Sequence, residues 1–117
     1  MYKLLIVDDE KNIRLGIQAM IAREFKSIVE VETAMDGLEA IGKLKDVDIL
    51  ITDIKMPRMD GIQLIEHIQQ SEQKTPAMVI LSGYDDFEFT KAAIKNKVKD
   101  YLLKPVNRNE LYQTVTN

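Results

Sequence analysis

The stretch Leu4-Leu5-Ile6-Val7-Asp8-Asp9-Glu10 decides the fold, because a short continuous apolar run ends there abruptly in three acids. A run of this length with no polar face is typical of a strand buried on both sides in a parallel sheet. Three similar runs each stop at a polar or turn-forming residue: Ile49 to Ile51, Met78 to Leu81, and Tyr101 to Leu103. Val29-Glu30-Val31-Glu32 instead alternates apolar and charged residues, which indicates an edge strand with one solvated face.

Helical patterns lie between and after the predicted strands. Apolar residues recur at helical spacing in these segments: Ile13, Ile17, Met20 and Ile21; Leu38, Ile41 and Leu44; Leu64, Ile65 and Ile68; Phe89, Ala92 and Ala93; and Leu111 with Val115. Asp36, Asp60 and Asp86 each precede a helical pattern and are expected to be N-caps. The alternation predicts a flavodoxin-like α/β fold, which is a doubly wound parallel sheet of five strands in the order 2-1-3-4-5 with five helices.

Length and composition narrow the function classes. The 117 residues, 45% of them hydrophobic, fit one domain over residues 1–117. The net charge of -3 offers no overall attraction to nucleic acid or to a membrane surface, so neither is expected to bind. The absence of cysteine excludes disulfides and thiolate chemistry. No segment is long enough for a signal peptide or a membrane span, so a cytoplasmic location is expected. The last helical pattern stops soon after it begins, which suggests a piece of a longer protein.

The residues that follow the predicted strands carry the chemistry. Asp8 and Asp9 follow the first strand, Asp53 the third, Ser82 the fourth, and Lys104 with Pro105 the fifth. The carboxyl ends of parallel strands share one edge of the sheet, and ligands bind there in such folds. These side chains are therefore expected to lie together. The second strand ends in Thr33-Ala34 and adds no ionisable group.

Three carboxylates at one edge, those of Asp8, Asp9 and Asp53, would raise one another's pKa unless a cation is bound among them. Magnesium prefers oxygen ligands and typically takes one or two carboxylates plus a phosphate oxygen, so Mg²⁺ is the expected cofactor. Lys104 would add a further positive charge and contact an incoming phosphate. A carboxylate can act as the nucleophile in phosphoryl transfer, and Asp53 is the predicted phosphoacceptor. Ser82 would donate its hydroxyl to a phosphoryl oxygen.

Four motifs carry a family resemblance: I-V-D-D-E at Ile6 to Glu10, D-I-K-M-P-R-M-D-G at Asp53 to Gly61, L-S-G-Y at Leu81 to Tyr84, and D-Y-L-L-K-P at Asp100 to Pro105. In order and spacing, the chain resembles the CheY-like receiver domains of two-component response regulators over essentially its whole length. The resemblance implies that Asp53 is the phosphoacceptor, Asp8 and Asp9 the metal-binding acidic pair, Ser82 the switch hydroxyl, Tyr101 the switch aromatic and Lys104 the phosphate-binding lysine. It also implies a metal ligand in the Lys55 backbone carbonyl and a cis peptide before Pro105.

The resemblance further implies a partner, a sensor histidine kinase whose phosphohistidine is the phosphodonor. The domain would catalyse only its own phosphorylation and slow dephosphorylation, so a signalling domain rather than an enzyme is expected. Phosphorylation would draw Ser82 toward the phosphate and allow Tyr101 to repack, changing a surface used for homodimerisation or for an output domain. The segment S-G-Y-D-D-F-E-F at Ser82 to Phe89 resembles receivers joined to AraC-type helix-turn-helix domains, so a C-terminal DNA-binding output domain is expected beyond this chain. Lys97 departs from the glycine usual after the fourth helix.

Other interpretations of the same residues stay open at this point. Taken singly, Asp8-Asp9 could simply start a helix, Asp53 could be a turn residue, and Tyr101 could only pack. A receiver fold that no longer accepts phosphate is one alternative, although the acidic pair, Asp53 and Lys104 are intact. A magnesium-dependent phosphohydrolase usually has a second aspartate two residues after the nucleophile, where Lys55 stands. A flavin or nucleotide binder would need a glycine-rich phosphate loop, which follows no predicted strand.

Overall fold

The computed structural model describes residues 1–25, 27–71, 74–83 and 98–116. These residues contain one five-stranded parallel sheet of order β2-β1-β3-β4-β5, as the sequence predicts. The strands are β1 (Tyr2–Val7), β2 (Val29–Ala34), β3 (Ile49–Asp53), β4 (Ala77–Ser82) and β5 (Asp100–Leu103). The predicted edge strand, β2, does lie at an edge, and β5 forms the other edge.

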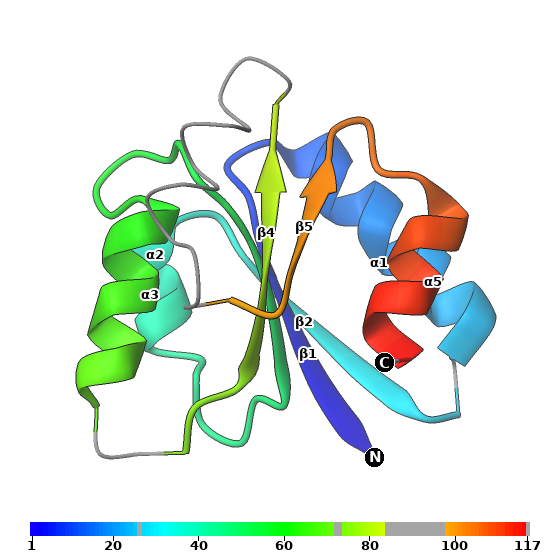
Figure 1. Cartoon of the computed structure of the whole chain (residues 1–117), viewed down its shortest axis with the longest axis horizontal. Coiled ribbons are helices and arrows are strands. Elements are labelled where there is room, and N and C mark those ends of the chain that lie inside the picture. The colour runs from blue at the N-terminus through cyan, green and yellow to red at the C-terminus, as the bar shows by residue number, and fades with distance from the viewer. Residues whose placement is uncertain (26, 72–73, 84–97, 117) are drawn as a thin grey trace.

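Helices cover both faces of the sheet. The described residues form α1 (Lys11–Phe25), α2 (Gly37–Ile41), α3 (Gly61–Gln70) and α5 (Arg108–Thr116). Figure 1 shows α2 and α3 together on one face and α1 and α5 together on the other. The predicted fourth helix, with Asp86 as its cap and Lys97 at its end, lies outside the described residues. None of the helices in the described ranges is sufficiently long and apolar to span a bilayer.

The alternation of side chains along β1 divides the interior into two cores. Leu4 and Ile6 face the layer of α1 and α5, where they pack with Ile17, Ile21 and Leu111. Leu5 and Val7 face the layer of α2 and α3, where they pack with Ala40, Leu64, Ile65 and Ile68. All four strand residues are fully buried. The apolar run that opens the sequence is therefore buried on both faces, and Asp8 is where it leaves the core.

Two of the predicted N-caps begin the helices of one layer. Asp36 accepts a hydrogen bond from the Glu39 backbone N–H, and Asp60 forms a capping box with Gln63 at the start of α3. The helical pattern of α2 was expected to extend to Leu44, but the helix ends at Ile41 with Gly42 as its C-cap. Glycine is a poor helix former, and the chain turns there while Leu44 still packs against the core.

Candidate functional site

The carboxyl ends of the strands meet at one edge of the sheet. Register pairs join the last residues of neighbouring strands: Val7 with Thr52, Asp53 with Leu81, and Ser82 with Leu103. Asp8 directly follows β1, Asp53 and Ser82 end β3 and β4, and Lys104 directly follows β5. The structure thus brings four of the predicted site residues to a common edge, and each comes from a different strand.

Lys104 stands between two buried carboxylates. Its Nζ lies 3.0 Å from Asp53 Oδ2 and 3.1 Å from Asp8 Oδ2. Asp8 is fully buried and Asp53 is 7% exposed, while the lysine side chain is 19% exposed. One ammonium group therefore forms ion pairs with two carboxylates that are largely shielded from bulk water. With both carboxylates ionised, the three side chains together carry one negative charge.

Burial and charge act in opposite directions on these groups. The pKa of Asp53 is raised, chiefly because burial disfavours the charged carboxylate, and the nearby Asp8 charge adds to that effect. The hydrogen bonds that Asp53 accepts from Lys104 and from the Ile54 backbone N–H oppose the rise without cancelling it. For Lys104, burial disfavours the charged form, but the attraction of Asp53 and Asp8 prevails and holds its pKa above the usual value. The site therefore stabilises the charged form of Lys104, whereas the single lysine does not fully offset the cost of ionising Asp53.

The β1–α1 turn fixes the position of Asp8. Its Oδ1 accepts a hydrogen bond of 2.8 Å from the Glu10 backbone N–H, and its backbone carbonyl accepts one of 2.7 Å from Arg14 Nη1. Its Oδ2 is buried and accepts no hydrogen bond from the described residues, although Lys104 is within ion-pair distance. The sequence did not predict a role for Arg14, because a side chain that binds a backbone carbonyl six residues earlier leaves no motif.

Carboxylate oxygens of Asp8, Asp9 and Glu10 lie within 4.8 Å of one another. Asp9 and Glu10 are exposed, and the buried Asp8 Oδ2 accepts no hydrogen bond from the described residues, so these oxygens suit a hard divalent cation such as Mg²⁺. Asp53 is joined to this cluster through Lys104, which contacts both Asp8 and Asp53. Glu10 was missed as a candidate ligand, and its only signal was its place as the third acid in the run.

The remaining predicted residues lie on β4, on β5 and in the loops that follow β3 and β5. Ser82 is 1% exposed, and its hydroxyl donates a 3.1 Å hydrogen bond to the Gly83 carbonyl. Tyr101 is half-buried against the core beneath α2 and α3, and burial raises its pKa. Lys55 is exposed in the loop that follows Asp53. The Lys104-Pro105 peptide bond is cis, as the family resemblance implies.

The loop between β3 and α3 is held tightly behind Asp53. The Gly61 backbone N–H donates a 2.8 Å hydrogen bond to the Ile54 carbonyl. A Cβ atom at Gly61 would run into the Asp53 backbone carbonyl, so only glycine permits this approach. The position of Asp53 at the end of its strand therefore depends on the start of the following helix.

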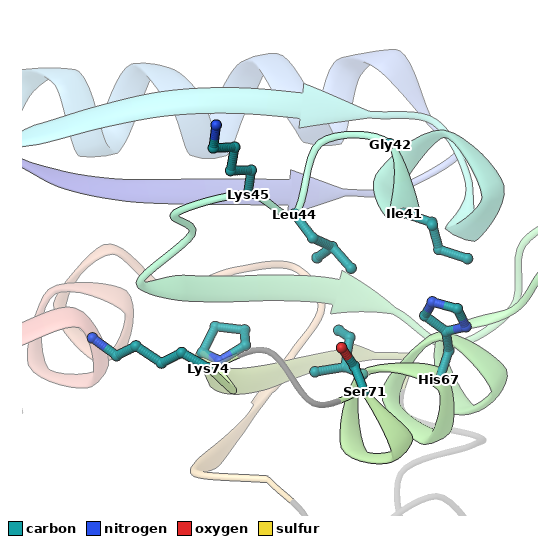
Figure 2. A pocket seen from close by; sticks show the side chains of 9 residues that line it. Ile41, Gly42, Leu44, Lys45, His67, Ser71 and Lys74 are labelled. Carbon is teal, nitrogen blue, oxygen red and sulfur yellow. The ribbon is translucent and has the colours of Figure 1, made fainter.

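One surface groove adjoins this edge of the sheet, and a smaller pocket lies away from it. A groove of about 400 Å³ adjoins Lys104 and is lined by Ile13, Gly16, Ile17, Met20, Pro105 and Val106. A smaller pocket of about 250 Å³ lies between α2 and α3, with Pro76 at the amino end of β4 among its lining residues (Figure 2). Figure 2 shows the side chains of Lys45 and Lys74 extending in different directions there. Their charges do not converge, so the smaller pocket lacks the arrangement found around Lys104.

Comparison with known proteins agrees with this architecture. The response regulator receiver domain family matches residues 4–116. An uncharacterized response regulatory protein of Staphylococcus epidermidis is 42% identical over 113 residues, which cover 95% of this chain and 44% of that protein. The transcriptional regulatory protein HptR of Staphylococcus aureus is 41% identical with the same coverage of both chains. The solved structure of a two component transcriptional regulator AraC from Clostridium phytofermentans is 34% identical, with a TM-score of 0.79, and the match covers 99% of this chain and 94% of that one.

The chain spans less than half the length of the curated relatives that it matches. The family match nevertheless extends over residues 4–116, a range that contains Asp8, Asp9, Asp53 and Lys104. The chain belongs to the response regulator receiver domain family.

Proposed function

We propose that the chain accepts a phosphoryl group on the Asp53 carboxylate, in a reaction that requires Mg²⁺. The observation that carries this proposal is the buried arrangement in which Lys104 contacts both Asp53 and Asp8. A buried carboxylate with a raised pKa and a specific charged partner, at the carboxyl edge of a parallel sheet, is typical of a reactive group.

The proposed donor is the phosphohistidine of a sensor histidine kinase. An Asp53 carboxylate oxygen attacks the phosphorus atom, the phosphorus–nitrogen bond breaks, and the imidazole leaves with the electron pair and takes up a proton. Mg²⁺, when bound by Asp8, Asp9, Asp53 and the Lys55 carbonyl, would neutralise charge on the transferred group. Lys104 would share that task, since its ammonium already lies 3.0 Å from the acceptor carboxylate. The chain would later hydrolyse its own acyl phosphate.

The proposed consequence is a conformational switch. A phosphoryl group adds negative charge and acceptor oxygens beside Ser82, whose hydroxyl otherwise donates to the neighbouring Gly83 carbonyl. If Ser82 turns toward the phosphate, Tyr101 on the neighbouring strand can repack, which would change the outer surface around β5 and α5. That surface would then favour a homodimer or contact an output domain.

The proposed output is transcription. HptR is named as a transcriptional regulatory protein and the similar structure as an AraC two component transcriptional regulator. A C-terminal DNA-binding domain of the AraC type, acting in the cytoplasm, fits these relatives and the -3 net charge, which gives the receiver itself no general attraction to DNA.

Intact mass spectrometry tests the proposed function. We expect wild-type protein incubated with Mg²⁺ and acetyl phosphate to gain the mass of one phosphoryl group, and the Asp53→Asn variant to gain none. Chelation of Mg²⁺ should abolish the wild-type product. A wild-type protein that stays unmodified, or an adduct that persists in Asp53→Asn, would overturn the assignment.

A further inference from the structure

The loop between β3 and α3 is fastened at its tip to the start of α2. Arg58, at the tip, points its guanidinium at Asp36: the Nε lies 2.7 Å and the Nη2 2.6 Å from Asp36 Oδ2. The carboxylate is 3% exposed, whereas the arginine side chain is 56% exposed. Oδ1 of the same carboxylate accepts the Glu39 backbone N–H. Oδ1 of Asp36 therefore caps α2, whereas Oδ2 forms the ion pair with Arg58 in the β3–α3 loop.

The backbone at this tip is strained. Arg58 has a φ of 65°, in the left-handed region that residues other than glycine rarely occupy. The Met59 N–H donates to the Pro57 carbonyl at 2.7 Å, so Arg58 is the central residue of a three-residue turn of the less stable, positive-φ kind. Strain of this sort persists only where the surroundings enforce it, and it concentrates at functional sites. The residue in this conformation is the one whose side chain pairs with Asp36.

A second contact between the same segments runs through the backbone. The Gly37 N–H donates a 3.0 Å hydrogen bond to the Met59 carbonyl. A Cβ atom at Gly37 would stand 2.6 Å from Met59 Cγ and 2.7 Å from its carbonyl oxygen, so the approach requires glycine. An ion pair and a close backbone contact therefore hold the same tip from adjacent residues of one turn.

The fastened loop is the one that begins at the phosphoacceptor. Its base is closed by the Gly61 N–H on the Ile54 carbonyl, and its tip is fastened at Arg58 and Met59. Lys55, whose carbonyl is a proposed metal ligand, lies between these two attachments. We propose that Asp36 and Arg58 are positioning residues for the metal site, an inference that rests on the proposed function: their ion pair holds the loop in the shape that binds Mg²⁺.

The pair can be broken without removing the helix cap. Asn is as good an N-cap as Asp, so Asp36→Asn keeps the Oδ1 contact to α2 and loses the charge that holds Arg58. Arg58→Gln removes the cation from the other side. Partners outside the ligand sphere typically contribute tenfold or more to metal affinity, so we expect each variant to bind Mg²⁺ about tenfold more weakly by isothermal titration calorimetry. The double variant should be no weaker than either single variant, because both remove one interaction.

Asp60→Asn is the matched control, because Asp60 caps the helix at the other end of the same loop and its partner there is the neutral Gln63. It should bind Mg²⁺ as wild type does. Phosphorylation by acetyl phosphate gives a second measurement: the Asp36→Asn and Arg58→Gln variants should be slow at low Mg²⁺ and recover the wild-type rate at saturating Mg²⁺. Arg58→Lys, which keeps the charge, should restore part of the affinity.

The outcomes separate the inference from the proposed function. A wild-type protein that binds Mg²⁺ and forms the acyl phosphate, with both variants within twofold of its Mg²⁺ affinity, would overturn the inference and leave the function intact. Lower melting temperatures with unchanged Mg²⁺ affinity would do the same, since the pair would then be only structural. A wild-type protein without Mg²⁺ binding would overturn both.

Discussion

Asp36, the N-cap of α2, and Asp53, the last residue of β3, are both buried carboxylates, yet their pKa values are shifted in opposite directions. Asp36 accepts the Glu39 N–H and the Arg58 guanidinium, and these hydrogen bonds hold its pKa below the ordinary value despite burial. Asp53 shares its lysine with Asp8, and burial holds its pKa above the ordinary value. Both residues are almost inaccessible to solvent, and each accepts one backbone N–H and one cationic side chain. Burial is the largest influence on the pKa only at Asp53, where Lys104 is shared with Asp8 and the Asp8 charge adds to the rise.

We propose that this difference separates a structural carboxylate, Asp36, from a reactive one, Asp53. A buried charge whose donors outweigh the cost of burial stabilises the fold, as Asp36 does for the start of α2. A buried charge that lacks such compensation is kept at a cost in stability, and it gains from an incoming cation. Low solvent exposure alone would not distinguish the two residues, whereas the sharing of Lys104 with Asp8 does.

Removal of Lys104 should have the largest effect, because it takes away the only cation that contacts Asp53 among the described residues. We expect Lys104→Met to lower the phosphorylation rate by about 10²-fold or more, as loss of one preorganised charge donor typically does. In metal-free buffer it should also lower the free energy of unfolding by about 3 kcal/mol, because two buried carboxylates lose their partner.

Lys3→Met is the matched control for that measurement. Lys3 pairs with Glu32 at 3.5 Å near the surface, where such a pair is worth less than about 1 kcal/mol. Urea denaturation followed by circular dichroism gives both values. Equal losses of unfolding free energy in Lys104→Met and Lys3→Met would show that Lys104 contributes no more than an ordinary surface charge. The contrast drawn between Asp53 and Asp36 would then fail.

Gly61→Ala should have the next largest effect. The added methyl group would press on the Asp53 carbonyl from the start of α3, and overpacking of this kind costs about 1–3 kcal/mol. Gly16→Ala in the middle of α1 meets nothing within 4 Å and should raise stability by about 0.5–1 kcal/mol, because alanine is the better helix former. Thermal denaturation of both variants tests this, and a Gly61→Ala protein as stable as wild type would contradict the close approach.

The fold and the central residues could be predicted from the sequence because both leave a local pattern. Apolar runs that stop at Asp8, Asp53 and Lys104 predict the strands and also name the residues at the shared edge. The contacts of Arg58 and Arg14 could not be predicted in this way. The arginine side chains are long, and each binds a group that no periodic pattern links to it: a carboxylate 22 residues away and a backbone carbonyl six residues away.

The end of α2 shows where apolar spacing fails to predict secondary structure. Apolar spacing continues to Leu44, but the chain leaves the helix at Gly42 and Leu44 reaches the same core from a turn. A residue can thus keep its place in the core after the helix has ended, so spacing alone overestimates helix length. Glu10 was missed as a candidate metal ligand for another reason, because exposed acids at a helix start are common without a ligand.

A smaller effect is expected from pH, with opposite signs at the two carboxylates. The pKa of Asp36 is lowered by folding, so its contribution is present above the ordinary carboxyl pKa of about 3.9 and is lost as pH falls through the folded value. The gap in unfolding free energy between wild type and Asp36→Asn should therefore close in acid. The pKa of Asp53 is raised, so its ionisation destabilises the fold increasingly as pH rises from about 3.9 through the folded value. Urea denaturation of wild type, Asp36→Asn and Asp53→Asn across this pH range checks both expectations. If the difference in unfolding free energy from wild type changed with pH in the same direction for both variants, the comparison would be contradicted.

We propose that Asp53 is a buried carboxylate retained for reaction at a cost in stability. The most direct test is the free energy of unfolding of wild type and Asp53→Asn at neutral pH in metal-free buffer. We predict that Asp53→Asn is the more stable protein, by about 0.5–2 kcal/mol, as relief of a strained active site typically gives. Saturating Mg²⁺ should stabilise wild type more than the variant. An Asp53→Asn protein that is less stable than wild type without metal would contradict the claim.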